Sequence, residues 1–77
     1  MPRFFFDIDD GTGVFRDTEG SDHEDLANAE SEAIDTLSAM GREIFPTKRD
    51  QELSVEIHDE DGRALLRIAL KLNIQGL

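Results

Sequence analysis

The sequence predicts an α+β fold with the order β-β-α-β-β, in which one helix packs on a four-stranded, mainly antiparallel sheet. Apolar and polar side chains alternate in two regions, one near each end of the chain. Each region contains an Asp-Gly turn, which predicts two hairpins. Between them, apolar residues recur at steps of three and four, which predicts one amphipathic helix. Because the chain has 77 residues, we expect one α+β domain spanning residues 1–77.

The first predicted hairpin lies in the amino-terminal region. Side chains alternate along RFFFDID, residues 3–9, so Phe5 points away from its neighbours Phe4 and Phe6. The turn DDGTG follows, where Asp and Gly suit positive φ and local side-chain hydrogen bonds. VFRD, residues 14–17, then predicts a short return strand.

The helix is predicted over residues 25–44. Its apolar stripe consists of Leu26, Ala29, Ala33, Leu37, Met40 and Ile44, widened by Ile34. Two positions are candidates for the helix N-cap. Asp25 directly precedes the apolar stripe, while Ser21 and Glu24 have the spacing of a capping box. Pro46 predicts the end of the helix, because a proline disfavours helical geometry in the residue before it.

ELSVEIH, residues 52–58, and RALLRIALKLNI, residues 63–74, predict the last two strands, joined by the turn DEDG. The apolar rows expected to face the helix are Leu53, Val55 and Ile57 in one strand, and Leu66, Ile68, Leu70, Leu72 and Ile74 in the other. The opposite face of the last strand carries Leu65 and Ala69 beside basic side chains.

The charge balance is strongly acidic, with 8 basic and 18 acidic residues and a net charge of −10. This argues against nucleic acid and membrane as partners, because phosphates and anionic lipids attract basic surfaces. No apolar run is long enough for a signal peptide or a membrane span, so we expect a cytoplasmic protein. Eight acids fall within residues 17–35, which predicts either a solvated face or a docking surface for a basic partner.

Sequence motifs for catalysis are missing, and we expect neither enzymatic activity nor a cofactor. The chain has no cysteine, no nucleophile elbow and no phosphate-binding glycine loop. The acidic turns depart from the calcium-loop pattern, which requires a bidentate glutamate at its last position. Asp7, Asp9 and His58 are expected on the open sheet face. They are the candidates for an alternative metal-binding or enzymatic site, although their spacing in the sequence matches no known metal motif.

Apolar side chains on the open sheet face predict an interface instead. Phe5 points to this face, and one of Val14 and Phe15 joins it, for which we expect Phe15. The predicted interface residues are Phe5, Phe15, Leu65 and Ala69. A contiguous exposed apolar patch usually marks an interaction site, and small cores are often supplemented by association, so we expect a homodimer or a partner protein.

Four stretches together resemble a family of short, uncharacterised proteobacterial proteins of the rhizobial type. They are MPRFFFDIDDG, RDTEG, DLANAESEA and VEIHDEDGRALLRI, with the MPR-aromatic-F-F start and the DEDGR hairpin as the clearest motifs. The resemblance covers about residues 1–70. It implies a stand-alone β-β-α-β-β domain of unknown function and brings no activity, cofactor or catalytic residue.

These observations predict a small, acidic, non-enzymatic module that self-associates or docks on a partner protein. One alternative is an antitoxin-like or DNA-mimicking acidic regulator of a basic partner. The other is a metal-binding or enzymatic site on the open sheet face.

Overall fold

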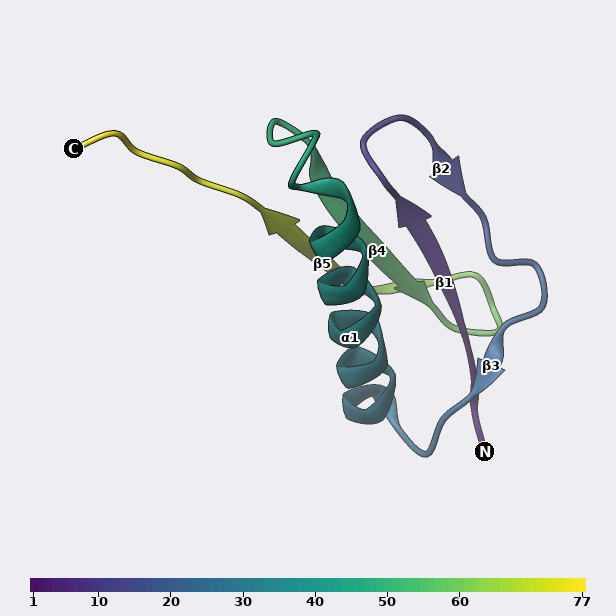
Figure 1. Cartoon of the computed structure of the whole chain (residues 1–77). Helices are drawn as coiled ribbons and strands as arrows, with labels where there is room; N and C mark the ends of the chain where they lie inside the picture. The colour runs from purple at the N-terminus through teal and green to yellow at the C-terminus, as the bar shows by residue number, and fades with distance from the viewer.

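A computed structural model describes residues 1–77 and shows one helix packed on one antiparallel sheet (Figure 1). The elements are β1 (Arg3–Asp9), β2 (Val14–Phe15), β3 (Ser21–Asp22), α1 (Leu26–Ile44), β4 (Glu52–His58) and β5 (Ala64–Lys71). The strand order is β2-β1-β4-β5, and β3 pairs with the other end of β1. The predicted α+β class, with the helix on the sheet, is confirmed. The helix is not long and apolar enough to cross a membrane.

The sheet has five strands, so the prediction of four was one short. The additional strand is β3, where Ser21 pairs with Phe4 and Asp22 pairs with Arg3. It lies in a stretch that the sequence predicts as a break, because two residues are too few to show alternation. Both β2 and β3 lie along the same edge of β1, and β4 occupies the other edge.

Helix α1 begins at the predicted cap. The Asp25 carboxylate accepts a hydrogen bond of 2.8 Å from the Asn28 N–H, and the alternative capping box is wrong because Ser21 belongs to β3. The helix ends at Ile44 as predicted, but the reason differs. Phe45, which precedes the proline, keeps helical angles (φ −61°, ψ −31°) and donates its N–H to the Gly41 carbonyl. Pro46 ends the ladder because it has no N–H to donate.

The core lies between α1 and the sheet and confirms the predicted facing of the long strands. Its buried apolar residues are Phe4, Ala29, Ala33, Leu37, Leu53, Val55 and Ile57. Helix α1 comes close to β5 at Gly41, where an added Cβ would lie 3.0 Å from the Phe45 ring and 3.2 Å from Leu70. Two expectations fail near β5: the strand ends at Lys71, which leaves Ile74 63% exposed, and Ile34 is 47% exposed instead of buried in the stripe.

Candidate functional site

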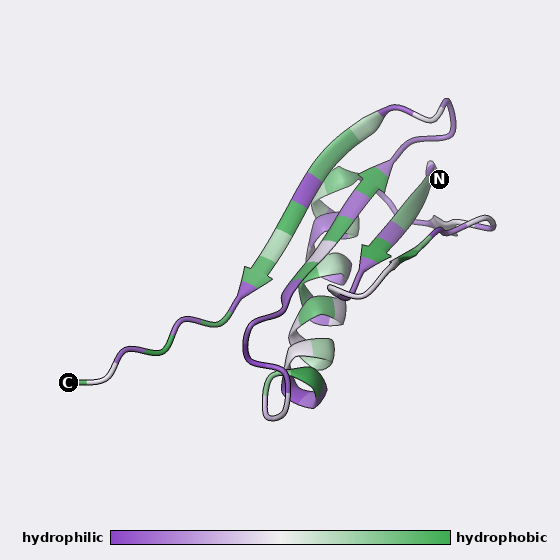
Figure 2. Cartoon of the chain, turned by 90° about the horizontal axis from the view of Figure 1, so that it is seen from above, coloured by the Kyte–Doolittle hydropathy of each residue, from purple (hydrophilic) through white to green (hydrophobic).

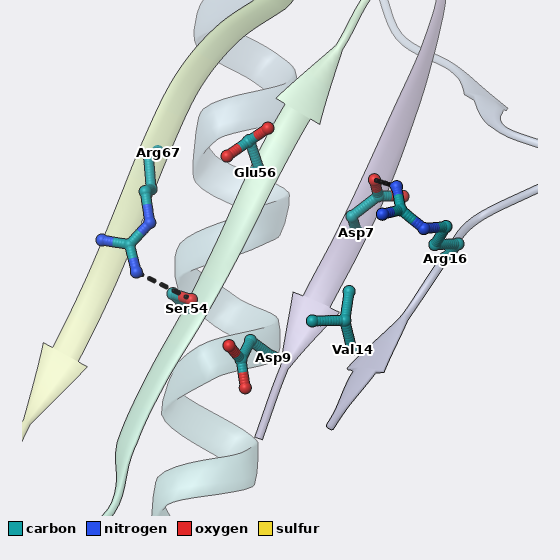
Figure 3. A pocket seen from close by; sticks show the side chains of 7 residues that line it. All are labelled: Asp7, Asp9, Val14, Arg16, Ser54, Glu56 and Arg67. Atoms are coloured by element: carbon teal, nitrogen blue, oxygen red, sulfur yellow. Dashed lines mark hydrogen bonds and ion pairs between the residues drawn. The ribbon is translucent and has the colours of Figure 1, made fainter. Parts of the chain in front are cut away.

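The face of the sheet away from α1 is polar. The strand register aligns Asp7, Glu56 and Arg67 in one row across β1, β4 and β5. Figure 3 shows this row around a shallow hollow of about 200 Å³, in which Val14 is the single apolar lining residue. Small-molecule sites are concave and mainly apolar, so this hollow lacks the walls of a ligand pocket.

Asp7 and His58 meet on this face. His58 Nε2 lies 3.3 Å from the Asp7 carboxylate and 3.1 Å from that of Glu56. Asp7 also lies 3.5 Å from Arg16 and accepts a hydrogen bond of 3.0 Å from the Asp17 N–H. The hydroxyl groups of Thr18 and Ser54 line the hollows on this face, but neither forms a hydrogen bond with the His58 imidazole.

Asp9, the third residue of the predicted metal or enzymatic site, lines the hollow beside Asp7 but makes no ion pair with His58. Its register partner is Ser54, one row away from Asp7, and its carboxylate accepts a hydrogen bond from the Gly11 N–H. The structure therefore brings together two of the three predicted residues. It contains no group of three or more His, Asp or Glu side chains that could hold a metal ion.

The predicted apolar patch does not form on the open face. Directly opposed residues of antiparallel strands share a face, and Phe15 pairs with Ile8, so Phe15 lies on the helix side of the sheet. Val14 takes the expected place, opposite Asp9. Phe5 is half-buried and lies in the row of His58.

Leu65 and Ala69, the other two predicted interface residues, are exposed on β5 but do not join Phe5. Ala69 pairs with Ser54, so the charged row that contains Arg67 separates it from Phe5. Leu65 is 37% exposed, and a bulge opposite Ile57/His58 leaves it without a partner in β4. Two of the exposed apolar side chains of the predicted interface therefore lie on the same strand, β5.

Asp17 closes the gap between β2 and β3. Its carboxylate accepts hydrogen bonds from the backbone N–H groups of Phe6 (3.1 Å), Gly20 (2.9 Å) and Glu19 (3.2 Å). The bond from Phe6 takes the place of a strand partner on the edge of β1, because neither β2 nor β3 reaches that residue. The motif RDTEG is thus a structural clamp that keeps this edge of the sheet covered.

The Asp17 environment also lowers its pKa. Partial burial raises the pKa of this carboxyl, but the hydrogen bonds from the Gly20, Phe6 and Glu19 backbone together outweigh burial, and the net pKa lies below the ordinary value. The charged form is therefore the one that the fold stabilises.

The other edge of the sheet, along β5, is uncovered. Figure 2 shows β5, the strand that leads into the carboxyl-terminal tail, as the outermost strand with nothing beyond it. It has eight residues, Ala64–Lys71, and pairs only with β4, so its outward N–H and C=O groups have no partner in the sheet.

An apolar groove runs beside this free edge, between α1 and β5. Five of its six lining residues are apolar, and the lining consists of Ile34, Leu37, Ser38, Ile68, Ala69 and Leu70. Sequence reasoning missed this site because strand order cannot be read from periodicity. Ile34 was the one sequence signal for this groove. It follows the buried Ala33 and so lies at the margin of the apolar stripe, where an apolar side chain extends beyond the face that the core covers.

Comparisons with known proteins give a family but no activity. Residues 3–71 match the family model described as "Domain of unknown function (DUF6894)". Searches of curated proteins and of solved structures found no significant match.

Proposed function

The chain belongs to the DUF6894 family, and we propose that it is a non-enzymatic interaction domain that receives an extended protein segment along β5. One observation carries this proposal: an eight-residue edge strand stands uncovered beside an apolar groove. An exposed edge is a template for strand addition, in which backbone hydrogen bonds give affinity and side-chain pockets give specificity.

The two edges of the sheet are treated differently, which supports this assignment. The edge of β1 is covered by β2, β3 and the Asp17 carboxylate. Natural proteins blunt an edge strand with proline, inward-pointing charges, exposed lysines, a β-bulge or a covering loop. Strand β5 has no proline, no inward-pointing charge and no covering loop, and its lysine and its bulge lie near its two ends, at Lys71 and Leu65. Arg67, its central charge, leans back over β4, with its guanidinium 3.4 Å from Ser54 Oγ and 3.6 Å from the Glu52 carboxylate.

The proposal is tested by selecting peptides from a random display library on the purified, dilute domain. We expect enrichment of extended peptides with alternating apolar residues, because alternate side chains of an added strand would face the groove. Their binding is expected to fall at least tenfold in Ile34→Glu, which places a charge in the groove. Binding should be unchanged in Phe15→Glu, which alters an exposed apolar side chain at the opposite edge of the sheet.

The salt dependence of binding separates this proposal from the acidic-regulator alternative. Strand addition rests on backbone hydrogen bonds and apolar contact, so binding should persist at high salt. Docking of a basic partner on the acidic surface would weaken strongly, because the Debye length falls from about 10 Å at 0.1 M to about 3 Å at 1 M. A chain that selects no extended peptide and is also monomeric would contradict the proposed function.

A further inference from the structure

We propose that the segment added along β5 is the β5 strand of a second copy of this chain, paired antiparallel about a two-fold axis at Ile68. This inference rests on the proposed function and names its partner. The two sheets then become one continuous sheet, with both copies of α1 on the same side.

The charge pattern of β5 and the length of the paired segment together select this register. Directly opposed residues of antiparallel strands lie on the same face of the sheet. Only registers that place helix-facing residues opposite helix-facing residues are therefore allowed, and the centre of the pairing moves one residue at a time among them. Centred on Arg67, the pairing would oppose two arginines, and centred on Ala69 it would oppose Arg67 to Lys71. Like charges directly opposite are destabilising.

Centred on Ile68, the pairing opposes no like charges and uses seven of the eight residues of β5, Leu65–Lys71. Pairings centred on Leu66 or Leu70 also oppose no like charges, but they use only five and three residues of the strand. Ile68 meets its own copy, Leu66 meets Leu70, and these residues share the helix-facing side. On the open face, Arg67 meets Ala69 and Lys71 meets Leu65. The exposed Leu65 is thereby covered by the aliphatic stem of a lysine.

The position of α1 suits a second copy better than an isolated strand. The helix contacts both β4 and β5. We take its axis to cross the sheet midway between these strands, which is about 2.4 Å inside β5 for strands about 4.8 Å apart. The two-fold axis would lie about 2.4 Å outside β5, which sets the two helix axes about 10 Å apart. Packed helices in proteins lie about 8–10 Å apart, so the second helix closes the groove.

The helix surface facing the groove is self-complementary. Ile34 lines the groove beside Ile68, so the same axis brings the two copies of Ile34 together and removes a 47% exposed apolar side chain from water. The two helices run antiparallel. This places the end that carries Arg42 beside the amino-terminal end of the other helix, which has Asp25 as its N-cap and Glu30 in its second turn.

The association is tested by the solution mass of three proteins, measured by light scattering at low and high salt. The unmodified chain should have about twice the 8.7 kDa mass of one chain at both salts. Ile34→Glu should be monomeric, because the axis would oppose two glutamates in an apolar contact. Phe15→Glu should remain dimeric, and circular dichroism should show that both variants are folded.

The register is tested at Ala69, which faces Arg67 of the other copy. Ala69→Arg should weaken the dimer about tenfold or more relative to Ala69→Glu, because each dimer contains this pair twice and its charge changes from unlike to like. Within one chain Arg67 and Lys71 flank position 69 on the same face, so the glutamate is also favoured in the monomer. Urea unfolding followed by circular dichroism must therefore show that both variants are folded before their dimer affinities are compared. Equal dimer affinities for the two variants would overturn the register.

Either of two results would show that the partner is not a second copy paired along β5. The first is that the unmodified chain is monomeric, and the second is that the Ile34→Glu variant is still dimeric. If the monomer nevertheless selects extended peptides whose binding is lost in Ile34→Glu, the proposed function stands and only the identity of the partner is wrong.

Discussion

Replacing Asp17 with alanine is expected to lower the free energy of unfolding by about 3 kcal/mol, since hydrogen bonds to a charged group contribute about 1.5–3 kcal/mol each. The carboxylate accepts three backbone hydrogen bonds, and the one from Phe6 joins the β2–β3 connection to the edge of β1. A domain of this size has a total stability of about 4–12 kcal/mol, so the loss should be large in urea unfolding followed by circular dichroism.

Asp10 provides the control for this measurement. Its carboxylate also accepts backbone hydrogen bonds, from Thr12 and Gly13, and its pKa is also lowered, chiefly by the Thr12 side chain. Those bonds stay within one exposed turn and join no strands. Asp10→Ala should therefore cost much less than Asp17→Ala, and equal losses would contradict the role of Asp17 as a clamp between strands.

The lowered pKa of Asp17 predicts a pH dependence of the same sign. A carboxyl with a folded-state pKa below its ordinary value of about 3.9 contributes its full stability above that value and loses it as the pH falls through the folded-state pKa. The unmodified domain should lose stability on acidification below about pH 4. Asp17→Asn should start less stable and lose less over the same range, and parallel curves for the two proteins would contradict this.

Replacing Gly20 with alanine is the second large effect that we expect, at about 3 kcal/mol. Gly20 has φ +71°, and left-handed geometry costs an L-residue about 1–2 kcal/mol. In addition, an added Cβ would lie 2.9 Å from the Phe5 ring and 3.0 Å from the Phe4 carbonyl oxygen, so β3 would have to move away from β1.

Gly62 separates these two contributions. It has a similar φ of +81°, but an added Cβ would meet nothing within 4 Å. Gly62→Ala should therefore show the conformational cost alone, about 1–2 kcal/mol by urea unfolding. If Gly20→Ala costs no more than Gly62→Ala, the tight packing of β3 against β1 is wrong.

Local patterns determined the parts of this fold that the sequence predicts well. The helix begins at Asp25 and ends at Ile44 because the cap and the proline act within a few residues. Apolar and polar side chains alternate over seven or eight residues in β4 and β5, which is long enough to predict the buried face. Val55 and Ile68 lie on the predicted side.

The errors fall where short strands depend on tertiary contacts. A two-residue strand such as β2 has no periodicity, so the choice between Val14 and Phe15 depends on the register with β1. Strand β3 exists because Asp17 and Gly20 bring the chain back to β1, and neither residue has β propensity. The free edge depends on strand order, which is set by long-range pairing, so the groove beside β5 could not be predicted.

The most direct test of the proposed assembly is the distance between spin labels on the two copies, measured by pulsed electron paramagnetic resonance. The chain has no cysteine, so Lys71→Cys carries a single label. Pairing about Ile68 places the two copies of residue 71 about 20 Å apart, whereas labels at Phe15→Cys, on the far edge of the sheet, lie more than about 30 Å apart. A narrow distribution near 20 Å for Lys71→Cys is the expected result. No measurable coupling at residue 71, or a shorter distance at residue 15 than at residue 71, would contradict association through β5.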